Sequence, residues 1–175
     1  MAELQIDFSE IYDDIQRDAI FRLRFEVHSP SGAYADEFLN GRWIDSHDES
    51  AVHFAATTDG NVIAAARLSL HAKLQDGPFG GHFQNKFRAA PGPYAVFSRL
   101  VVTPFRNRGV AATLDNMRMT RARTAGATHA FAATSNPSRF ASLARLGFKK
   151  ISEERECELS NKVWGTLFAC DLAYE

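Results

Sequence analysis

The chain has 175 residues, 45% of them hydrophobic, which fits a single domain with a sizeable core. Its 20 Lys and Arg residues nearly balance 21 Asp and Glu, so no bulk charge favours nucleic acid or an anionic membrane. No apolar stretch is long enough to span a bilayer, and the acidic N-terminus lacks a signal-peptide core, so we expect a cytoplasmic protein. Cys157, Cys170 and the six histidines show no metal-ligand spacing, so we predict no metal site.

The first half of the chain predicts a strand, a helix, a long loop and a hairpin. The Asp59-Gly60 pair between two apolar runs is typical of a hairpin turn. The long loop contains Trp43 and several acidic residues, and such a loop is either functional or a packed surface loop. In chain order we expect a strand at 4–8, a helix at 13–29, the loop at 29–50, and strands at 53–58 and 62–70.

The second half alternates strands with helices, which predicts an α/β or α+β domain with one central sheet. In chain order we expect a lid or insertion at 71–93 with a short helix near 82–88, a strand at 95–102, a helix after Gly109, a strand at 130–134, a helix from about Asn136 to Gly147, and an antiparallel pair at 149–159 and 163–172. Four phenylalanines suit an acyl tunnel or a plain core equally well: Phe79, Phe83, Phe87 and Phe97.

The turn between the strand at 95–102 and the following helix has the composition of an anion site. The first N–H groups of a helix have no partner inside the helix and carry partial positive charge, so a phosphate fits there. Gly109 allows close approach of the backbone, and Arg106 and Arg108 add positive charge. The alternative is an ordinary strand–helix connection with a basic surface turn.

The spacing of Arg106, Gly109 and Ala111 resembles the coenzyme A pyrophosphate loop of the GNAT acyltransferases. Asn136, followed by a helix that ends in Leu146-Gly147-Phe148, resembles the second helix motif of that family. The resemblance implies one mixed, mostly antiparallel sheet flanked by helices, with a splayed strand pair that forms the acyl-CoA cleft, and acetyl-CoA or a longer acyl-CoA as donor. It assigns cofactor binding to Leu100, Val101, Val102, Arg106, Asn107, Arg108, Gly109, Val110, Ala111, Ala112 and Asn136.

The first half resembles a narrower branch, the autoinducer (acyl-homoserine lactone) synthases and the related N-acyl amino acid synthases. The resemblance is carried by Arg24 on the first helix, Trp43, the pair Asp45 and Asp48, Arg67 before Leu68, and Ser98-Arg99. It implies catalytic roles for Ser98, Arg99, Asp45 and Asp48, and substrate contacts from Arg24, Trp43 and Arg67. Two positions depart from the pattern, because Val96 stands where the branch has Glu and Leu143 where many GNAT members have the Tyr that protonates the thiolate.

These observations predict an N-acyltransferase that moves an acyl group from acyl-CoA, or from an acyl carrier protein, to a small amine by direct attack. Arg24, Arg67 and Arg99 suit a carboxylate on the acceptor, since Arg makes paired hydrogen bonds to carboxylates. Candidates for the base are Asp45, Asp48, His53 or a water chain held by Ser98. The alternatives are a non-catalytic acyl-CoA-binding or sensing module and an acetyltransferase of a protein amine.

We expect one GNAT-like domain over residues 1–175 and a monomer or homodimer. Within this domain, we expect 1–94 to form the acceptor side, 95–150 the acyl-CoA-binding core and 151–175 a closing strand pair. No nucleic-acid partner is expected.

Overall fold

The computed structural model describes residues 5–88, 90–103, 109–160 and 163–172. The chain clusters into two compact units: unit 1 comprises Met1–Arg67 and Arg99–Arg118, and unit 2 comprises Leu68–Ser98 and Met119–Glu175. The chain passes from one unit to the other inside two strands, β5 (Asn61–His71) and β6 (Tyr94–Val102), and one helix, α3 (Val110–Thr124). These three elements therefore contribute residues to both units.

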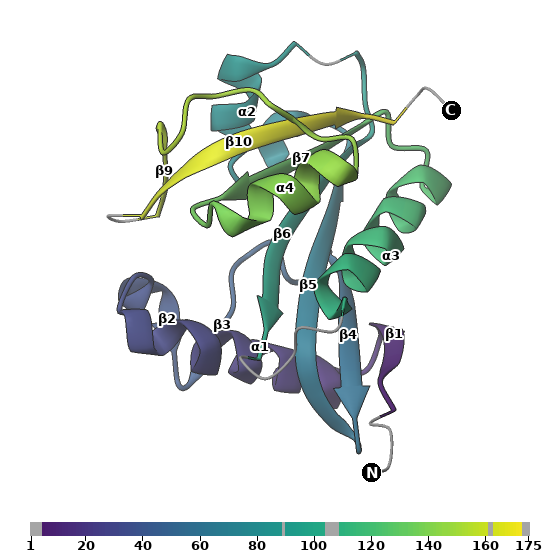
Figure 1. The fold of residues 1–175 in the computed structure, drawn as a ribbon, viewed down its shortest axis with the longest axis vertical. Coiled ribbons are helices and arrows are strands. Elements are labelled where there is room, and N and C mark those ends of the chain that lie inside the picture. The colour runs from purple at the N-terminus through teal and green to yellow at the C-terminus, as the bar shows by residue number, and fades with distance from the viewer. Residues whose placement is uncertain (1–4, 89, 104–108, 161–162, 173–175) are drawn as a thin grey trace. The chain divides into compact units, whose positions relative to one another are not determined.

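Unit 1 holds one end of the sheet and the helix α1 (Figure 1). Apolar side chains of this helix pack on the strands. The core cluster joins Ile20 and Leu23 of the helix to Ala55, Ala65 and Val101 of three strands. The strand order is β1 (Asp7–Ile11), β4 (Val52–Thr58), β5 (Asn61–His71) and β6 (Tyr94–Val102), with α1 at Asp14–His28 and β1 antiparallel to β4.

Local sequence explains the two best-defined features of unit 1. The side chain of Asp13 caps α1 by accepting from the backbone N–H of Gln16 at 2.8 Å. Asp59 and Gly60 both have positive φ, 48° and 76°, as a two-residue hairpin turn requires. The predicted first helix and the hairpin are confirmed.

The predicted irregular loop at 29–50 is more structured than expected. It contains two 3₁₀ turns and a short antiparallel hairpin, in which Phe38 pairs with Trp43. This hairpin places Trp43 in the interior, where its side chain is 3% exposed. The segments are 3₁₀ turns at Ser29–Ser31 and Ala35–Glu37 and strands β2 (Phe38–Leu39) and β3 (Arg42–Trp43).

Unit 2 contains the remaining strands and two helices. β6 runs parallel to β7, and the paired residues are Tyr94–Phe97 and His129–Ala132. β10 (Val163–Asp171) pairs antiparallel with β7, β8 and β9. The elements are a 3₁₀ turn at Leu74–Asp76, α2 (Gly80–Lys86), β7 (His129–Thr134), α4 (Ser138–Arg145), β8 (Lys149–Lys150), β9 (Cys157–Ser160) and β10 (Val163–Asp171), in the strand order β5, β6, β7, β10, β8, with β9 also paired to β10.

The helices α2 and α4 cover opposite faces of the unit-2 strands (Figure 1). Phe83 of α2 contacts Phe131 of β7, with ring centroids 5.1 Å apart. Phe140 contacts Phe168 of β10 at 5.2 Å, and Phe168 is opposite Ala132 rather than Phe131. Because neighbouring residues of a strand point to opposite faces, the two contacts lie on different sides of the sheet. Phe83 is fully buried, which places it in the core.

The predicted fold class is confirmed: the sheet is mixed, mostly antiparallel and flanked by helices. The predicted strand at 149–159 is instead two short strands, β8 and β9, since residues 151–156 lie outside both. No helix in the described part of the chain is long and apolar enough to cross a membrane.

Candidate functional site

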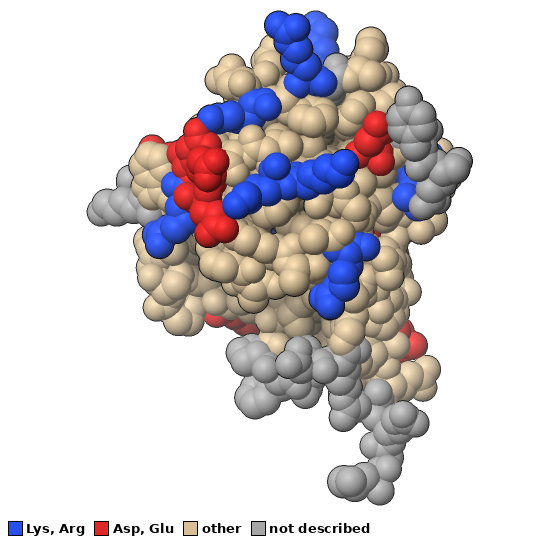
Figure 2. All heavy atoms as spheres, turned by 45° about the horizontal axis from the view of Figure 1, so that its top comes forward, with Lys and Arg blue, Asp and Glu red and all other residues tan. Residues whose placement is uncertain are grey.

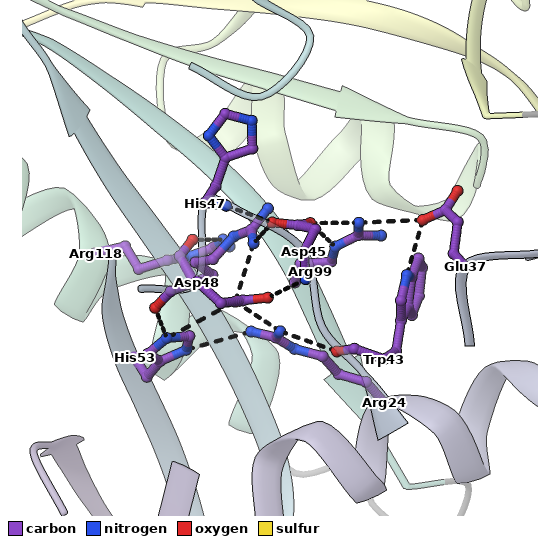
Figure 3. A network of polar contacts seen from close by, with 10 residues as sticks. Arg24, Glu37, Trp43, Asp45, His47, Asp48, His53, Arg99 and Arg118 are labelled. Carbon is purple, nitrogen blue, oxygen red and sulfur yellow. Dashed lines mark hydrogen bonds and ion pairs between the residues drawn. The ribbon is translucent and has the colours of Figure 1, made fainter. Parts of the chain in front are cut away.

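A network of charged side chains lies inside unit 1 (Figure 3). Its members come from four strands, one 3₁₀ turn, two helices and the loop after β3, so residues far apart in sequence meet. They are Arg24 on α1, Glu37, Trp43, Asp45, His47, Asp48, His53 on β4, Arg67 on β5, Arg99 on β6, and Asp115 and Arg118 on α3 (Val110–Thr124). Arg24, Trp43, Asp45, Asp48, Arg67 and Arg99, all selected from the sequence, belong to it.

Asp48 occupies the centre of the network and is 2% exposed. Its Oδ1 accepts from Arg24 at 2.8 Å and lies 3.0 Å from the Nη1 of Arg67. Its Oδ2 accepts from the backbone N–H of Asp45 at 2.9 Å. Both oxygens are therefore held, one by guanidinium groups and one by the loop backbone.

Asp45 joins two guanidinium groups from neighbouring strands. Arg67 donates to its Oδ1 at 2.5 Å, and Arg99 donates to its Oδ2 at 2.6 Å. The backbone N–H of His47 also donates to Oδ1, at 2.9 Å, while the imidazole of His47 points away from the ion pairs (Figure 3). Charge-assisted hydrogen bonds of this kind are stronger than neutral ones, so the loop is anchored to β5 and β6.

Arg99 differs from the other arginines of the network in backbone and exposure. Its φ is +53°, which is unusual for a non-glycine residue within a strand. Its side chain is 12% exposed and reaches Glu37 at 3.3 Å, and its guanidinium lies 3.8 Å from the ring centroid of Trp43. The indole N–H of Trp43 donates to the same Glu37 at 2.8 Å. Glu37 was missed in the sequence, because nothing near it marks one acid among many.

His53 is buried between Arg24 and Asp48, and its contacts show which ring nitrogen carries the hydrogen. The guanidinium of Arg24 donates to Nδ1 at 3.3 Å, since Arg has only donors, so Nε2 carries the hydrogen and donates to the carbonyl of Asp48 at 3.1 Å. Burial, with the charge of Arg24, lowers the pKa of His53 to about 4. The imidazole is therefore neutral near pH 7.

The charges of the network shift several pKa values. Burial alone would raise the pKa of Asp45, but the hydrogen bonds and charges of Arg67 and Arg99 hold it well below its usual range. Burial acts in the same direction on Asp48 and is again outweighed, here by Arg24 and Arg67, so its pKa is lowered. Burial, together with the charges of Arg67 and Arg99, lowers the pKa of Arg24 to about 10. All three groups are ionised near neutral pH.

This arrangement is a rigid frame that matches four guanidinium groups with four carboxylates among the described residues. A carboxylate held by two guanidinium groups is a poor proton acceptor, and His53 is buried away from the solvent side from which a substrate would come. Asp45, Asp48 and His53 are therefore better suited to orienting groups than to taking a proton. Arg99 is the guanidinium of the network with measurable exposure.

Asp115 and Arg118 of α3 form a pair that the sequence analysis did not assign to the site. Both side chains are 1% exposed and they are ion-paired with each other. Arg118 also donates to the backbone carbonyl of Arg67 at 3.2 Å. Arg118 is buried rather than solvated, since the buried face of α3 passes through Val110, Leu114 and Arg118.

The donor-side residues are only partly within the described chain. α3 begins at Val110, directly after Gly109, whose φ is +75° and which has open space at its Cβ position. Val101 packs in the unit-1 core, and Leu100 and Val102 are half-buried. Ala111 is half-buried and Ala112 exposed. Arg106, Asn107 and Arg108 lie outside the described residues.

The remaining predicted positions belong to unit 2. The side chain of Asn136 accepts from the backbone N–H of Ser138 at 3.0 Å and so forms an Asx turn just before α4. Ser98 is 8% exposed on β6. Leu143 and Val96, the two positions that depart from the expected pattern, are buried, and Val96 belongs to the apolar cluster of unit 2.

Surface charge is mixed on the face that Figure 2 shows, where Lys and Arg stand as separate groups with Asp and Glu beside several of them. Across the ranges that the structure describes, no group of three or more His, Cys, Asp or Glu side chains is arranged to hold a metal ion.

Comparison with known proteins gives a consistent result. The family described as N-acyl amino acid synthase FeeM matches residues 19–171. The solved structure of FeeM, an N-acyl amino acid synthase from uncultured soil microbes, has a TM-score of 0.75 at 15% identity, covering 97% of this chain and 92% of that one. No curated protein matches the sequence significantly.

Two further solved structures share the fold at low identity. BjaI, a CoA-dependent acyl-homoserine lactone synthase solved with SAM and isopentyl-CoA, has a TM-score of 0.74 at 17% identity, covering 97% of this chain and 84% of that one. Escherichia coli ElaA has a TM-score of 0.67 at 15% identity, covering 95% of this chain and 100% of that one.

Proposed function

The chain belongs to the FeeM family of N-acyl amino acid synthases and is an acyltransferase, and from this we propose that it moves an acyl group from acyl-CoA to a small amine that carries a carboxylate. The donor of the proposal is acetyl-CoA or a longer acyl-CoA, with an acyl carrier protein as the alternative carrier. The amine nitrogen attacks the thioester carbonyl carbon, the carbon–sulfur bond breaks, and the products are an amide and a thiol.

The observation that carries the acceptor part of the proposal is the greater exposure of the Arg99 side chain compared with the other two arginines that contact Asp45 and Asp48. Arg24 and Arg67 are 0% and 1% exposed and are committed to Asp48 and Asp45. Arg99 is 12% exposed, and its orientation is held by Asp45, Glu37 and the ring of Trp43. We assign Arg99 to the acceptor carboxylate and the buried arginines to the frame that orients it.

The donor part of the proposal is supported by the start of α3. Gly109 has the positive φ that favours glycine, and the helix begins at the next residue, so its first amides are available to a phosphate. Arg106, Asn107, Arg108 and the carbonyl-polarising amides near Leu100 and Val101 stay predictions. Orientation of donor and acceptor supplies most of the rate in this proposal.

Fewer groups are suited to accept the proton of the attacking amine than the sequence suggested. The amine must lose a proton before or during attack, and Asp45, Asp48 and His53 are held or buried as described. We therefore assign this step to water held at Ser98. The acid that protonates the departing thiolate is water in the same proposal, because Leu143 offers no proton.

The test is release of free thiol from acetyl-CoA and from a long-chain acyl-CoA. Each amino acid is compared with the amine that lacks its carboxylate. A charge-assisted contact contributes about 1.5–3 kcal/mol, so we expect the amino acids to be preferred by about 10–100-fold.

Arg99→Gln should remove that preference, while Arg123→Gln, an exposed arginine on the last turn of α3, should keep it. Equal rates with both acceptor classes would refute the carboxylate assignment. Donor binding without turnover would instead leave a non-catalytic acyl-CoA-binding protein.

A further inference from the structure

The buried pair of Asp115 and Arg118 connects α3 to the charged network of unit 1. The two side chains are 1% exposed, three residues apart on one face of the helix, and ion-paired. Arg118 extends from this pair to β5, where its Nη1 donates to the carbonyl of Arg67 at 3.2 Å. The carbonyl belongs to the same residue whose guanidinium holds Asp45 and Asp48.

An apolar pair of similar volume would fill this space without the desolvation cost of two buried charges. What a guanidinium adds is a directed hydrogen bond to one carbonyl oxygen. In β5 that bond restrains the backbone of Arg67, from which the side chain reaches Asp45 at 2.5 Å and Asp48 at 3.0 Å. The orientation of one buried arginine therefore depends on the other.

We infer that Arg118, oriented by Asp115, is a positioning residue that fixes Arg67 and through it the carboxylates that hold Arg99. The inference rests on the proposed function, since it gives the acceptor-side network a mechanical support on the helix that starts the donor site. Arg118 touches no substrate in this scheme. It acts through Arg67.

α3 connects Arg118 to the proposed donor site, because the same helix carries Arg118 and begins where the donor phosphate is proposed to bind. Val110 and Leu114 are 1% and 0% exposed, so one face of the helix is buried from its first turn to Arg118. A donor phosphate that restrains the start of α3 also restrains Arg118. The restraint then passes through Arg67 and Asp45 to Arg99, which lies over the ring of Trp43.

Trp43 is a built-in probe of this connection. The chain has two tryptophans, Trp43 in the network and Trp164, which is 43% exposed in unit 2. Trp164→Phe leaves Trp43 as the source of indole fluorescence. Its emission then reports on the cation above its ring and on Glu37, which accepts its N–H.

The experiment titrates acetyl-CoA into the Trp164→Phe protein, with correction for adenine absorbance, and follows melting temperature in parallel. We expect the emission of Trp43 to change with the same midpoint as the melting temperature. In Trp164→Phe with Asp115→Leu and Arg118→Met, acetyl-CoA should still raise the melting temperature, but the emission change should be lost. Arg123→Gln in the Trp164→Phe background is the matched control and should keep both responses.

Three outcomes overturn the inference. The emission change can persist in the Asp115→Leu and Arg118→Met protein, or it can be absent from the parent although acetyl-CoA raises the melting temperature. Either result removes the positioning role and leaves the proposed function intact. If neither acetyl-CoA nor a long-chain acyl-CoA binds the parent, the acyl-CoA donor of the proposed function fails and the inference fails with it. The two residues are replaced together because Arg118→Gln alone would remove the ion-pair partner of buried Asp115 and destabilise the protein for that reason.

Discussion

The stability lost when a charged side chain is removed depends on whether its ionic partners are buried. Asp48 has two buried guanidinium partners and the backbone N–H of Asp45, whereas Asp14 pairs with Arg17 at 3.2 Å and is 93% exposed. A buried charge that loses its partner keeps its desolvation penalty, while a surface pair is screened by water.

We therefore expect Asp48→Asn to lower the free energy of unfolding by about 3–5 kcal/mol, and Asp14→Asn by under about 1 kcal/mol. Chemical denaturation of both variants beside the parent measures the difference. Equal losses at the two positions would contradict the description of Asp48 as the centre of the network.

His53 makes stability depend on pH in a defined window. Its pKa is lowered from 6.5 to about 4, so between these values the unfolded chain binds a proton that the folded protein excludes. The free energy of unfolding should therefore fall as pH drops from 6.5 towards 4, by about 3 kcal/mol in total. Burial also lowers the pKa of His28, which adds a slope of the same sign.

His53→Gln keeps a donor and an acceptor without the titration, so the slope of unfolding free energy against pH should become shallower. Denaturation at several pH values between 4 and 7 measures it. An unchanged slope would mean that His53 is not the group that titrates. The depressed carboxyl pKa values act at lower pH, because that stability is lost only as pH falls through the folded pKa of each group.

At the scale of elements, α3 has a positive-φ glycine at each end. Gly109 precedes the first turn with φ +75°, and Gly126 follows the last with φ +73°, and both have open space at the Cβ position. Valine at either place forces a β-branched residue into the left-handed region, at about 1–2 kcal/mol.

Gly109→Val and Gly126→Val should therefore destabilise the protein to a similar extent. Affinity for acetyl-CoA, measured by calorimetry, should fall in Gly109→Val alone, because its helix end carries the free amides. A comparable loss of affinity in Gly126→Val would argue against phosphate binding at the start of α3.

Elements were predictable from sequence where the signal is local. The Asp13 cap and the Asp59-Gly60 turn act through neighbouring backbone groups, so α1 and the hairpin were correctly placed. Arg24, Trp43 and Arg67 were found through a resemblance to relatives. Glu37 and Arg118 were missed, because the residues of the network that they contact, Arg99 and Arg67, lie 62 and 51 residues away along the chain. A lone charge in a helical pattern is more often solvated.

At the scale of the whole molecule, binding of a donor should appear as stability. A ligand that binds only the folded state adds about 2.7 kcal/mol at 100 times its Kd, which is about 5–10 °C for a chain of this length. We expect acetyl-CoA to raise the melting temperature in this way, and a long-chain acyl-CoA to raise it further if apolar surface receives the chain. A larger shift with free CoA than with either thioester would contradict an acyl-CoA donor.

The matching of four guanidinium groups by four carboxylates constrains how this site can diverge. Asp48 is shared by Arg24 and Arg67, and Asp45 by Arg67 and Arg99, so replacing one partner leaves a charge stranded in the interior. Asp115 and Arg118 are ion-paired with each other, and both side chains are 1% exposed. In related chains we therefore expect Asp115 and Arg118 to be replaced together, and the loss of either shared acid to require changes at both of its arginines.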